Sequence, residues 1–181
     1  MANRAYLLLH DYPEPVLHNT TGVSIALAAS YSMPVFWISA FSLDCVKSIS
    51  VPVVNDRGDE SSAKVPTLHS DISTAVMRSE AKREFLLNYL PSALLPQYQE
   101  WLTLLKNATK RYLQMDIAEL WMMAEPQEFE KTLNKCLNAF DRRHAAEVDL
   151  LFCQANLDLD GQRKIKYYDK TDVYGLIGYK W

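Results

Sequence analysis

Residues 126–155, PQEFEKTLNKCLNAFDRRHAAEVDLLFCQA, contain the longest periodic pattern in the chain. Apolar side chains recur there every three or four positions, as they do on one face of an α-helix. The stripe consists of Phe129, Leu133, Cys136, Leu137, Phe140, His144, Val148, Leu151, Phe152 and Ala155. Pro126 suits the first turn of a helix, so we predict one helix from Pro126 to about Ala155, with a stripe about seven turns long.

Three further helices are predicted before this one. They run from Asp71 to about Leu90, from a cap at Ser92 through Tyr112, and from Asp116 to about Ala124. Asp and Ser at a helix start accept hydrogen bonds from backbone N–H groups that lack helical partners. Glu119 three residues after Asp116 resembles a capping pair. Residues 71–157 are therefore predicted to be mainly helical.

The two ends of the chain have strand-like composition. Predicted strands cover residues 4–9, 35–41 and 45–54 near the start, and 165–168 and 173–179 near the end. β-Branched and aromatic residues dominate these segments. A short helix is expected from Gly22 to Ser30, behind a threonine cap, and an exposed loop from Asn55 to Lys64. Pro52 indicates an edge position or a bulge for the strand that contains it.

Together these elements predict a single α+β domain over residues 1–181. Residues 1–54 would be strand-rich with a short helix, 71–157 helical, and 162–181 closing strands. We expect a small, mostly antiparallel sheet formed by the N-terminal and C-terminal strands, packed against a central set of about four to five helices. The first strand would share this sheet with the closing strand, and the last helix would cover one face.

Composition excludes several classes of protein. Apolar residues make up 49% of the chain and charged residues 23%, and the formal net charge is −3. Nucleic-acid binding requires a concentrated basic surface, so we expect none. The most apolar window, residues 22–41, contains serines and Pro34 and does not suit a bilayer span. With no secretory signal pattern at the start, a cytoplasmic location is expected.

Motifs for catalysis and metal binding are absent from the sequence. Cys45, Cys136 and Cys153 lie far apart and predict reduced, buried thiols. Asn156–Gly161 matches the first half of an EF-hand loop, but Tyr167 stands where the bidentate glutamate belongs, so a turn into a strand is favoured. The four histidines are scattered, and His144 is interpreted as a core or boundary residue. No catalytic residue, metal or cofactor is predicted.

The opening Met1-Ala-Asn-Arg-Ala-Tyr-Leu7 resembles the start of an uncharacterised bacterial family whose members begin with MANR, an aromatic residue and a short strand. Residues 25–41, the segment Asp116–Leu120 and an aromatic closing strand fit the same resemblance. Members of this family are similar to immunity proteins of bacterial toxin systems. The resemblance implies a protein-binding role and a cognate toxin as partner, and it supplies no catalytic residues.

The leading hypothesis is therefore an immunity protein that binds and neutralises a toxin. Candidate partner-binding residues are acidic side chains of the polar loop and aromatic side chains of the closing segment, because acidic groups steer a basic partner and aromatics dominate binding hot spots. They are Asp56, Asp59, Glu60, Tyr167, Tyr168, Tyr174 and Trp181. Alternatives are a small enzyme whose active site follows no known motif and a structural subunit of a larger assembly.

Overall fold

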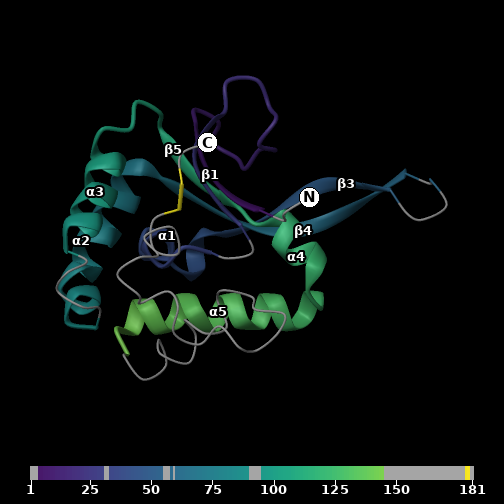
Figure 1. The fold of residues 1–181 in the computed structure, drawn as a ribbon. Helices are drawn as coiled ribbons and strands as arrows, with labels where there is room; N and C mark the ends of the chain where they lie inside the picture. Colours follow the sequence, from purple (N-terminus) through teal and green to yellow (C-terminus); the bar gives the residue numbers. More distant parts are fainter. Residues whose placement is uncertain are drawn as a thin grey trace.

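The computed structural model describes residues 4–30, 33–54, 58, 60–89, 95–144 and 178–179. Its strands are β1 (Arg4–His10), β2 (Ser24–Ser30), β3 (Val46–Val54), β4 (Glu60–Asp71) and β5 (Tyr112–Asp116). Its helices are α1 (Val35–Ser39), α2 (Ile72–Tyr89), α3 (Leu95–Lys106), α4 (Ala118–Met123) and α5 (Pro126–Arg142), with a 3₁₀ turn η1 (Leu43–Cys45). The α+β class and the number of helices are confirmed (Figure 1).

The described strands form one antiparallel sheet in the order β2-β1-β5-β4-β3. Two consecutive hairpins, β1–β2 and β3–β4, flank the central strand β5. The prediction that N-terminal and C-terminal strands alone build the sheet is wrong, because β5 comes from the stretch predicted to be helical. Its five residues are too few to show a period of two against the helical pattern around them.

Two neighbouring segments exchange their predicted structures. Ser24–Ser30, expected to be helical, is strand β2, and Val35–Ser39, expected to be a strand, is helix α1. All five residues of α1 are buried, so the helix has no polar face and its sequence carries no helical period. In β2, pairing with β1 outweighs the helix propensity of three alanines.

The strand predicted at residues 45–54 is confirmed as β3, and its edge position in the sheet agrees with Pro52. The exposed loop predicted from Asn55 to Lys64 is too long, because β4 already begins at Glu60. The polar residues from Glu60 to Lys64 pair with β3 in register and remain mostly exposed. Exposure and polarity in this stretch therefore indicate the end of a hairpin rather than an irregular loop.

Helix starts are predicted better than helix ends. Asp71 caps α2, where its Oδ1 accepts a hydrogen bond from the backbone N–H of Ser73 at 2.8 Å. Pro126 opens α5, as expected, and the stripe is buried from Phe129 to Phe140. The helix ends at Arg142 rather than near residue 155, because Arg143 adopts the left-handed conformation that terminates helices (φ 54°).

The closing strands predicted at residues 165–168 and 173–179, and the Asn156–Gly161 turn, lie outside the described residues except for Gly178 and Tyr179. Tyr179 forms two backbone hydrogen bonds with Ala28, so this end of the chain extends the sheet beyond β2 rather than beside β1. Its hydroxyl contacts Ser30 Oγ at 3.1 Å, close to the start of β1.

The sheet separates two layers of different chemistry. Helices cover the face that carries Ala5, Leu7, Leu113 and Met115, and this layer holds the main core. Its largest fully buried side chains include Trp37, Trp101, Tyr98, Phe36, Phe129 and Phe140. The opposite face, which we call the polar face, carries Tyr6, His10, Thr67, His69, Gln114 and Asp116. Residues 11–23, here called the covering segment, contact it and lie above the sheet in Figure 1, with α5 below.

Candidate functional site

Of the seven predicted partner-binding residues, only Glu60 lies in the described part of the structure. It is exposed, stands first in β4 and pairs with Val54 across the hairpin. Asp56, Asp59, Tyr167, Tyr168, Tyr174 and Trp181 lie outside the described residues. The hairpin that carries Glu60 is therefore the part of the predicted surface that the structure places.

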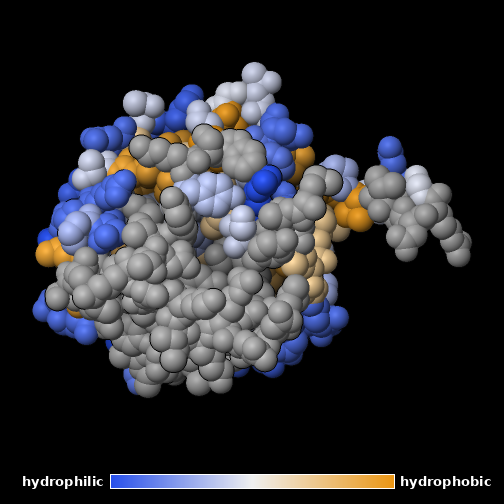
Figure 2. All heavy atoms as spheres, in the orientation of Figure 1, coloured by the Kyte–Doolittle hydropathy of each residue, from blue (hydrophilic) through white to orange (hydrophobic). Residues whose placement is uncertain are grey.

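This hairpin extends past the rest of the sheet. β5 pairs with β4 only from Thr67 to Asp71, so Glu60–Pro66 has β3 as its one described strand partner. We call residues 48–54 and 60–66 the ribbon. Figure 1 and Figure 2 both show it projecting from the body of the molecule.

The two faces of the ribbon differ in polarity. Alternate residues of β3 point to opposite sides, so Ile49, Val51 and Val53 share one face and Ser48 and Ser50 share the other. The three β-branched side chains are half-buried, whereas the two serines are exposed. Opposite them, the apolar face of the ribbon continues with Ala63 and Val65, and its serine-bearing face with Ser62 and Lys64.

Two prolines explain why the ribbon leaves the sheet and why its edge stays open. Pro66 pairs with Ser48, and Pro52 pairs with Ser62. A residue pair that exchanges two hydrogen bonds needs both N–H groups, so both pairs occupy non-hydrogen-bonded positions. The backbone nitrogen of Pro66 then faces β5, and the backbone nitrogen of Pro52 faces the outer edge of the sheet. Each proline removes a donor there, which ends pairing with β5 and weakens the free edge as a template.

The polar face of the sheet brings together groups that are far apart in sequence. Strand register places Tyr6, Asp116 and Thr67 in one row across β1, β5 and β4. The next rows are Leu8, Gln114 and His69, and then His10, Tyr112 and Asp71. Three of the four histidines therefore gather on or above one face. They are scattered in the sequence, and neither the apolar run of residues 6–10 nor the five residues 112–116 carries enough alternation to bring them together.

His10 is part of a fully bonded buried network. The backbone N–H of Tyr12 donates to His10 Nδ1 at 3.2 Å, so the ring proton lies on Nε2 and donates to Gln114 Oε1 at 3.1 Å. Gln114 in turn bonds both backbone groups of Val16, at 2.9 and 2.8 Å. Burial, reinforced by the nearby His69, lowers the pKa of His10, so the imidazole is held neutral.

His69 differs from His10 because its buried Nε2 has no hydrogen-bond partner within the described part of the chain. Its ring stacks on Tyr112 at 5.0 Å between centroids and on His10 at 5.4 Å. Burial lowers the pKa of His69, and the neutral ring suits this aromatic stack. Among the described residues, no group of three or more His, Cys, Asp or Glu is arranged to hold a metal ion.

His18, on the covering segment, pairs with a carboxylate of this face. Its Nδ1 lies 3.2 Å from Asp116 Oδ2, and the two side chains are 40% and 8% exposed. Asp116 is itself oriented by the backbone N–H of Ala118, and the His18 ring stacks on Tyr6 at 4.9 Å. The hydrogen bond to Asp116 raises the pKa of His18. A carboxylate that orients an imidazole is one half of a general-base site, but the described contacts of His18 include no Ser, Thr or Cys nucleophile.

Glu119, from the first turn of α4, joins the same corner of the molecule. Its carboxylate accepts a hydrogen bond from the backbone N–H of Arg4 at 2.8 Å and one from the Tyr6 hydroxyl at 3.4 Å. The expected capping pair with Asp116 is thus only half correct. Asp116 accepts the N–H of Ala118, whereas Glu119 holds the start of β1.

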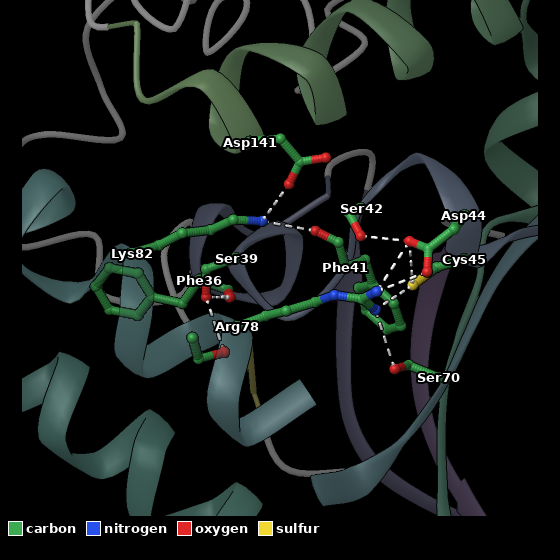
Figure 3. Close-up of polar contacts among 11 residues, drawn as sticks. Phe36, Ser39, Phe41, Ser42, Asp44, Cys45, Ser70, Arg78, Lys82 and Asp141 are labelled. Atoms are coloured by element: carbon green, nitrogen blue, oxygen red, sulfur yellow. Dashed lines mark hydrogen bonds and ion pairs between the residues drawn. The ribbon is translucent and has the colours of Figure 1, made fainter. Parts of the chain in front are cut away.

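A second polar cluster lies on the helical side and ties α2 to its neighbours (Figure 3). Arg78 Nη2 donates to both carboxylate oxygens of Asp44 at 2.9 and 2.7 Å, and Nη1 donates to Cys45 Sγ at 2.7 Å. The buried Lys82 Nζ lies 3.0 Å from Asp141 Oδ1 and donates to the Phe41 carbonyl at 2.8 Å. Burial lowers the pKa of Lys82, and Asp141 opposes this shift. Each charge here is paired with a group of the fold itself, and removal of either partner of the buried Lys82 pair would leave an uncompensated charge, so the cluster has a structural role.

The predicted thiols and the fourth histidine can also be placed. Cys45 and Cys136 are buried and free, as expected, and Cys153 lies outside the described residues. Burial raises the pKa of Cys136 to about 12, so this thiol is not a nucleophile at neutral pH. His144 is exposed at the end of α5, so the prediction of a core or boundary residue is wrong. The helix ends at Arg142, two residues before His144, so His144 does not join the stripe.

No helix in the described ranges is long and apolar enough to cross a membrane. Comparison with known families found no family model that matches this chain. Searches among curated proteins and among solved structures likewise found no match.

Proposed function

We propose that this chain is an immunity protein that acts in the cytoplasm by binding a protein toxin and blocking it. The observation that supports this proposal best is the projecting ribbon, whose apolar face carries Ile49, Val51 and Val53 half-buried in the described structure. An isolated two-stranded ribbon is marginally stable in water, so a partner that packs on its apolar face would stabilise it. The MANR-type opening of the sequence points to the same role.

The surroundings of the ribbon suit a complex that forms through side chains. Pro52 weakens the outer edge as a site for strand addition, so the apolar face is the better contact surface. Exposed Lys47 lies on the same face of β3 and would form part of a polar rim, whereas Lys64 and Glu60 point to the opposite face. A contact of about 800 Å² per partner is enough for occlusion, and the net charge of −3 favours encounter with a basic toxin.

The test is co-expression with the toxin domain encoded beside this chain, read as rescue of growth and as co-elution on a sizing column. In the variant Val51→Asp a charge enters the apolar face, and affinity should fall by about tenfold or more, the loss typical of a truncated hot-spot contact. Ser50→Asp, one residue away on the opposite face of the ribbon, is the matched control and should bind normally. No rescue and no complex for the unchanged chain would refute the proposal, and equal losses in both variants would remove the ribbon face from it.

A second candidate function is a small enzyme that inactivates its target through proton transfer. The specific observation in its favour is the His18–Asp116 pair, with a 40% exposed imidazole held by a buried carboxylate. Stoichiometry separates the two functions, because a binding inhibitor protects one toxin per chain whereas an enzyme protects at substoichiometric amounts. Loss of protection in His18→Gln, with Val51→Asp unaffected, would favour the enzyme.

A further inference from the structure

The covering segment is attached to the sheet by two different kinds of contact. At its start, Asp11 bonds Lys110 Nζ and the backbone N–H of Arg111, and Val16 is bonded through both backbone groups to Gln114. None of these bonds requires a proton to be gained or lost near neutral pH, because Gln114 does not titrate and the pKa of Asp11 lies below its already acidic ordinary value. The first half of the segment is therefore held independently of pH.

In the second half, Leu17–Val23, hydrogen bonding to the sheet depends on a single titratable side chain, and Val23 at its end also packs on the apolar cluster of Tyr6, Leu8 and Ala28. The described polar contact of this half with the sheet is the bond from His18 to Asp116, assisted by the stack of the ring on Tyr6. Its other described bonds stay within the covering segment: Thr20 N–H to Leu17 O, Val23 N–H to Thr20 O, and Tyr12 hydroxyl to Thr21 O. If the bond to Asp116 weakens, no other described hydrogen bond keeps this half on the sheet.

The charges around His18 favour its protonated form from two elements. Asp116 of β5 is the direct partner, and Glu119 of α4 adds a second negative charge. Tyr6 of β1 is held neutral, since burial raises its pKa above 10, and Arg4 lies beside Tyr6 on the same strand. The closed position of this half therefore gains most electrostatic stabilisation when the imidazole carries its second proton and is positively charged.

We propose that Leu17–Val23 is a pH-sensitive latch over the polar face, closed while His18 is protonated and opened more often once His18 loses its proton. Opening would uncover Tyr6, which is 6% exposed, and Asp116. This inference goes beyond the proposed function and does not rest on it, because it follows from contacts inside the chain.

The direction of the effect follows from linkage. The pKa of His18 is raised in the closed state, whereas in the open state it returns to its ordinary value of about 6.5. The stabilisation of the closed state is fully present below pH 6.5 and is lost as pH rises through the pKa of the closed form. His10 and His69 have lowered pKa values, so they are neutral in both states over this window and do not oppose the change.

Limited proteolysis of the full chain with chymotrypsin tests the latch through cleavage after Leu17, measured by mass spectrometry between pH 6.5 and 8.5. A synthetic peptide of residues 11–23 in the same tube corrects for the pH dependence of the protease. The corrected rate for the unchanged chain should rise about two- to fivefold with pH, the range expected for a partly exposed ion pair. His18→Gln should be cleaved at the faster rate throughout, and the exposed control His144→Gln should follow the unchanged chain.

A second measurement keeps the idea testable if a variant changes the fold. The His18 ring titration, followed by NMR, should have its midpoint above 6.5, and Asp116→Asn should lower that midpoint. A midpoint at or below 6.5 in the unchanged chain would overturn the latch. So would corrected cleavage rates that are flat with pH, or that rise equally in the unchanged chain and in His18→Gln.

Discussion

Gly178 occupies a position with no room for a side chain. It has φ +79°, and a Cβ placed on it would lie 2.7 Å from Trp37 Cζ2 and 2.8 Å from the carbonyl oxygen of Ala28. Neither neighbour can move easily, since Trp37 is fully buried and Ala28 is bonded to Tyr179. The absence of a side chain at residue 178 is therefore what allows this end of the chain to join the sheet.

We expect Gly178→Ala to lower the free energy of unfolding by about 2–4 kcal/mol, the sum of a positive-φ cost and an overpacking cost. Thermal denaturation should show a melting temperature lower by about 5–15 °C. Gly58→Ala is the matched control, because Gly58 also has a positive φ of +83° but no atom within 4 Å of the added Cβ. A loss as small as that of the control would show that the contacts with Trp37 and Ala28 are unimportant.

At the same scale, sequence reasoning identified capping residues but not the site. Asp71 and Pro126 are recognisable because a helix start depends on one or two neighbouring residues. His18 and Asp116 are separated by 98 positions and meet only because β1 and β5 pair in a particular register. The chemistry of the polar face is a property of that register, and one sequence does not specify it.

Among the elements, strand β3 offers the clearest test of edge protection. Pro52 stands where a backbone N–H would otherwise face the open edge of the sheet. Pro52→Thr should restore that donor and promote pairing between two copies, seen as a concentration-dependent dimer or aggregate in sedimentation velocity. Ser50→Thr adds the same β-branched residue at an equivalent position without a new N–H. Its sedimentation should be the same as that of the unchanged chain. If neither variant associates more than the unchanged chain, the proline does not protect the edge.

Errors of element type have a common physical cause. Helix α1 is buried on every side, so its residues resemble a buried strand, and β2 is rich in alanine, so it resembles a helix. In both cases the deciding interactions come from elsewhere, from α2 and α5 around α1 and from β1 beside β2. Where one face is exposed, as on α5, the period is visible and the helix is predicted correctly from Pro126 to Arg142, although not its end.

At the scale of the whole molecule, we expect stability to fall in mild acid. His10 and His69 have pKa values lowered by burial, so below pH 6.5 the unfolded chain binds protons that the folded chain excludes. Each histidine then lowers the free energy of unfolding by at most about 1.4 kcal/mol per pH unit. His18 acts in the opposite direction, because its raised pKa adds stability that is lost only as pH rises.

Urea unfolding at pH 5.0, 6.5 and 8.0 measures this dependence. His69→Phe keeps a flat aromatic ring in the stack with Tyr112 but cannot titrate. Between pH 6.5 and 5.0 its free energy of unfolding should therefore fall less than that of the unchanged chain. The slope with pH is the relevant quantity, and it can be compared even if the variant differs in absolute stability. An identical slope in both proteins would mean that His69 is not a source of the acid sensitivity.

The central position of β5 has a consequence for how the chain is made. The hairpins β1–β2 and β3–β4 can form as soon as each leaves the ribosome, but β1 and β4 have no common neighbour until residues 112–116 emerge. For about forty residues of synthesis after β4 is complete, the nascent chain therefore exposes two inner strand edges. Insertion of β5 closes both at once and should be a late, slow event of folding, since its pairing with β1 joins distant parts of the sequence.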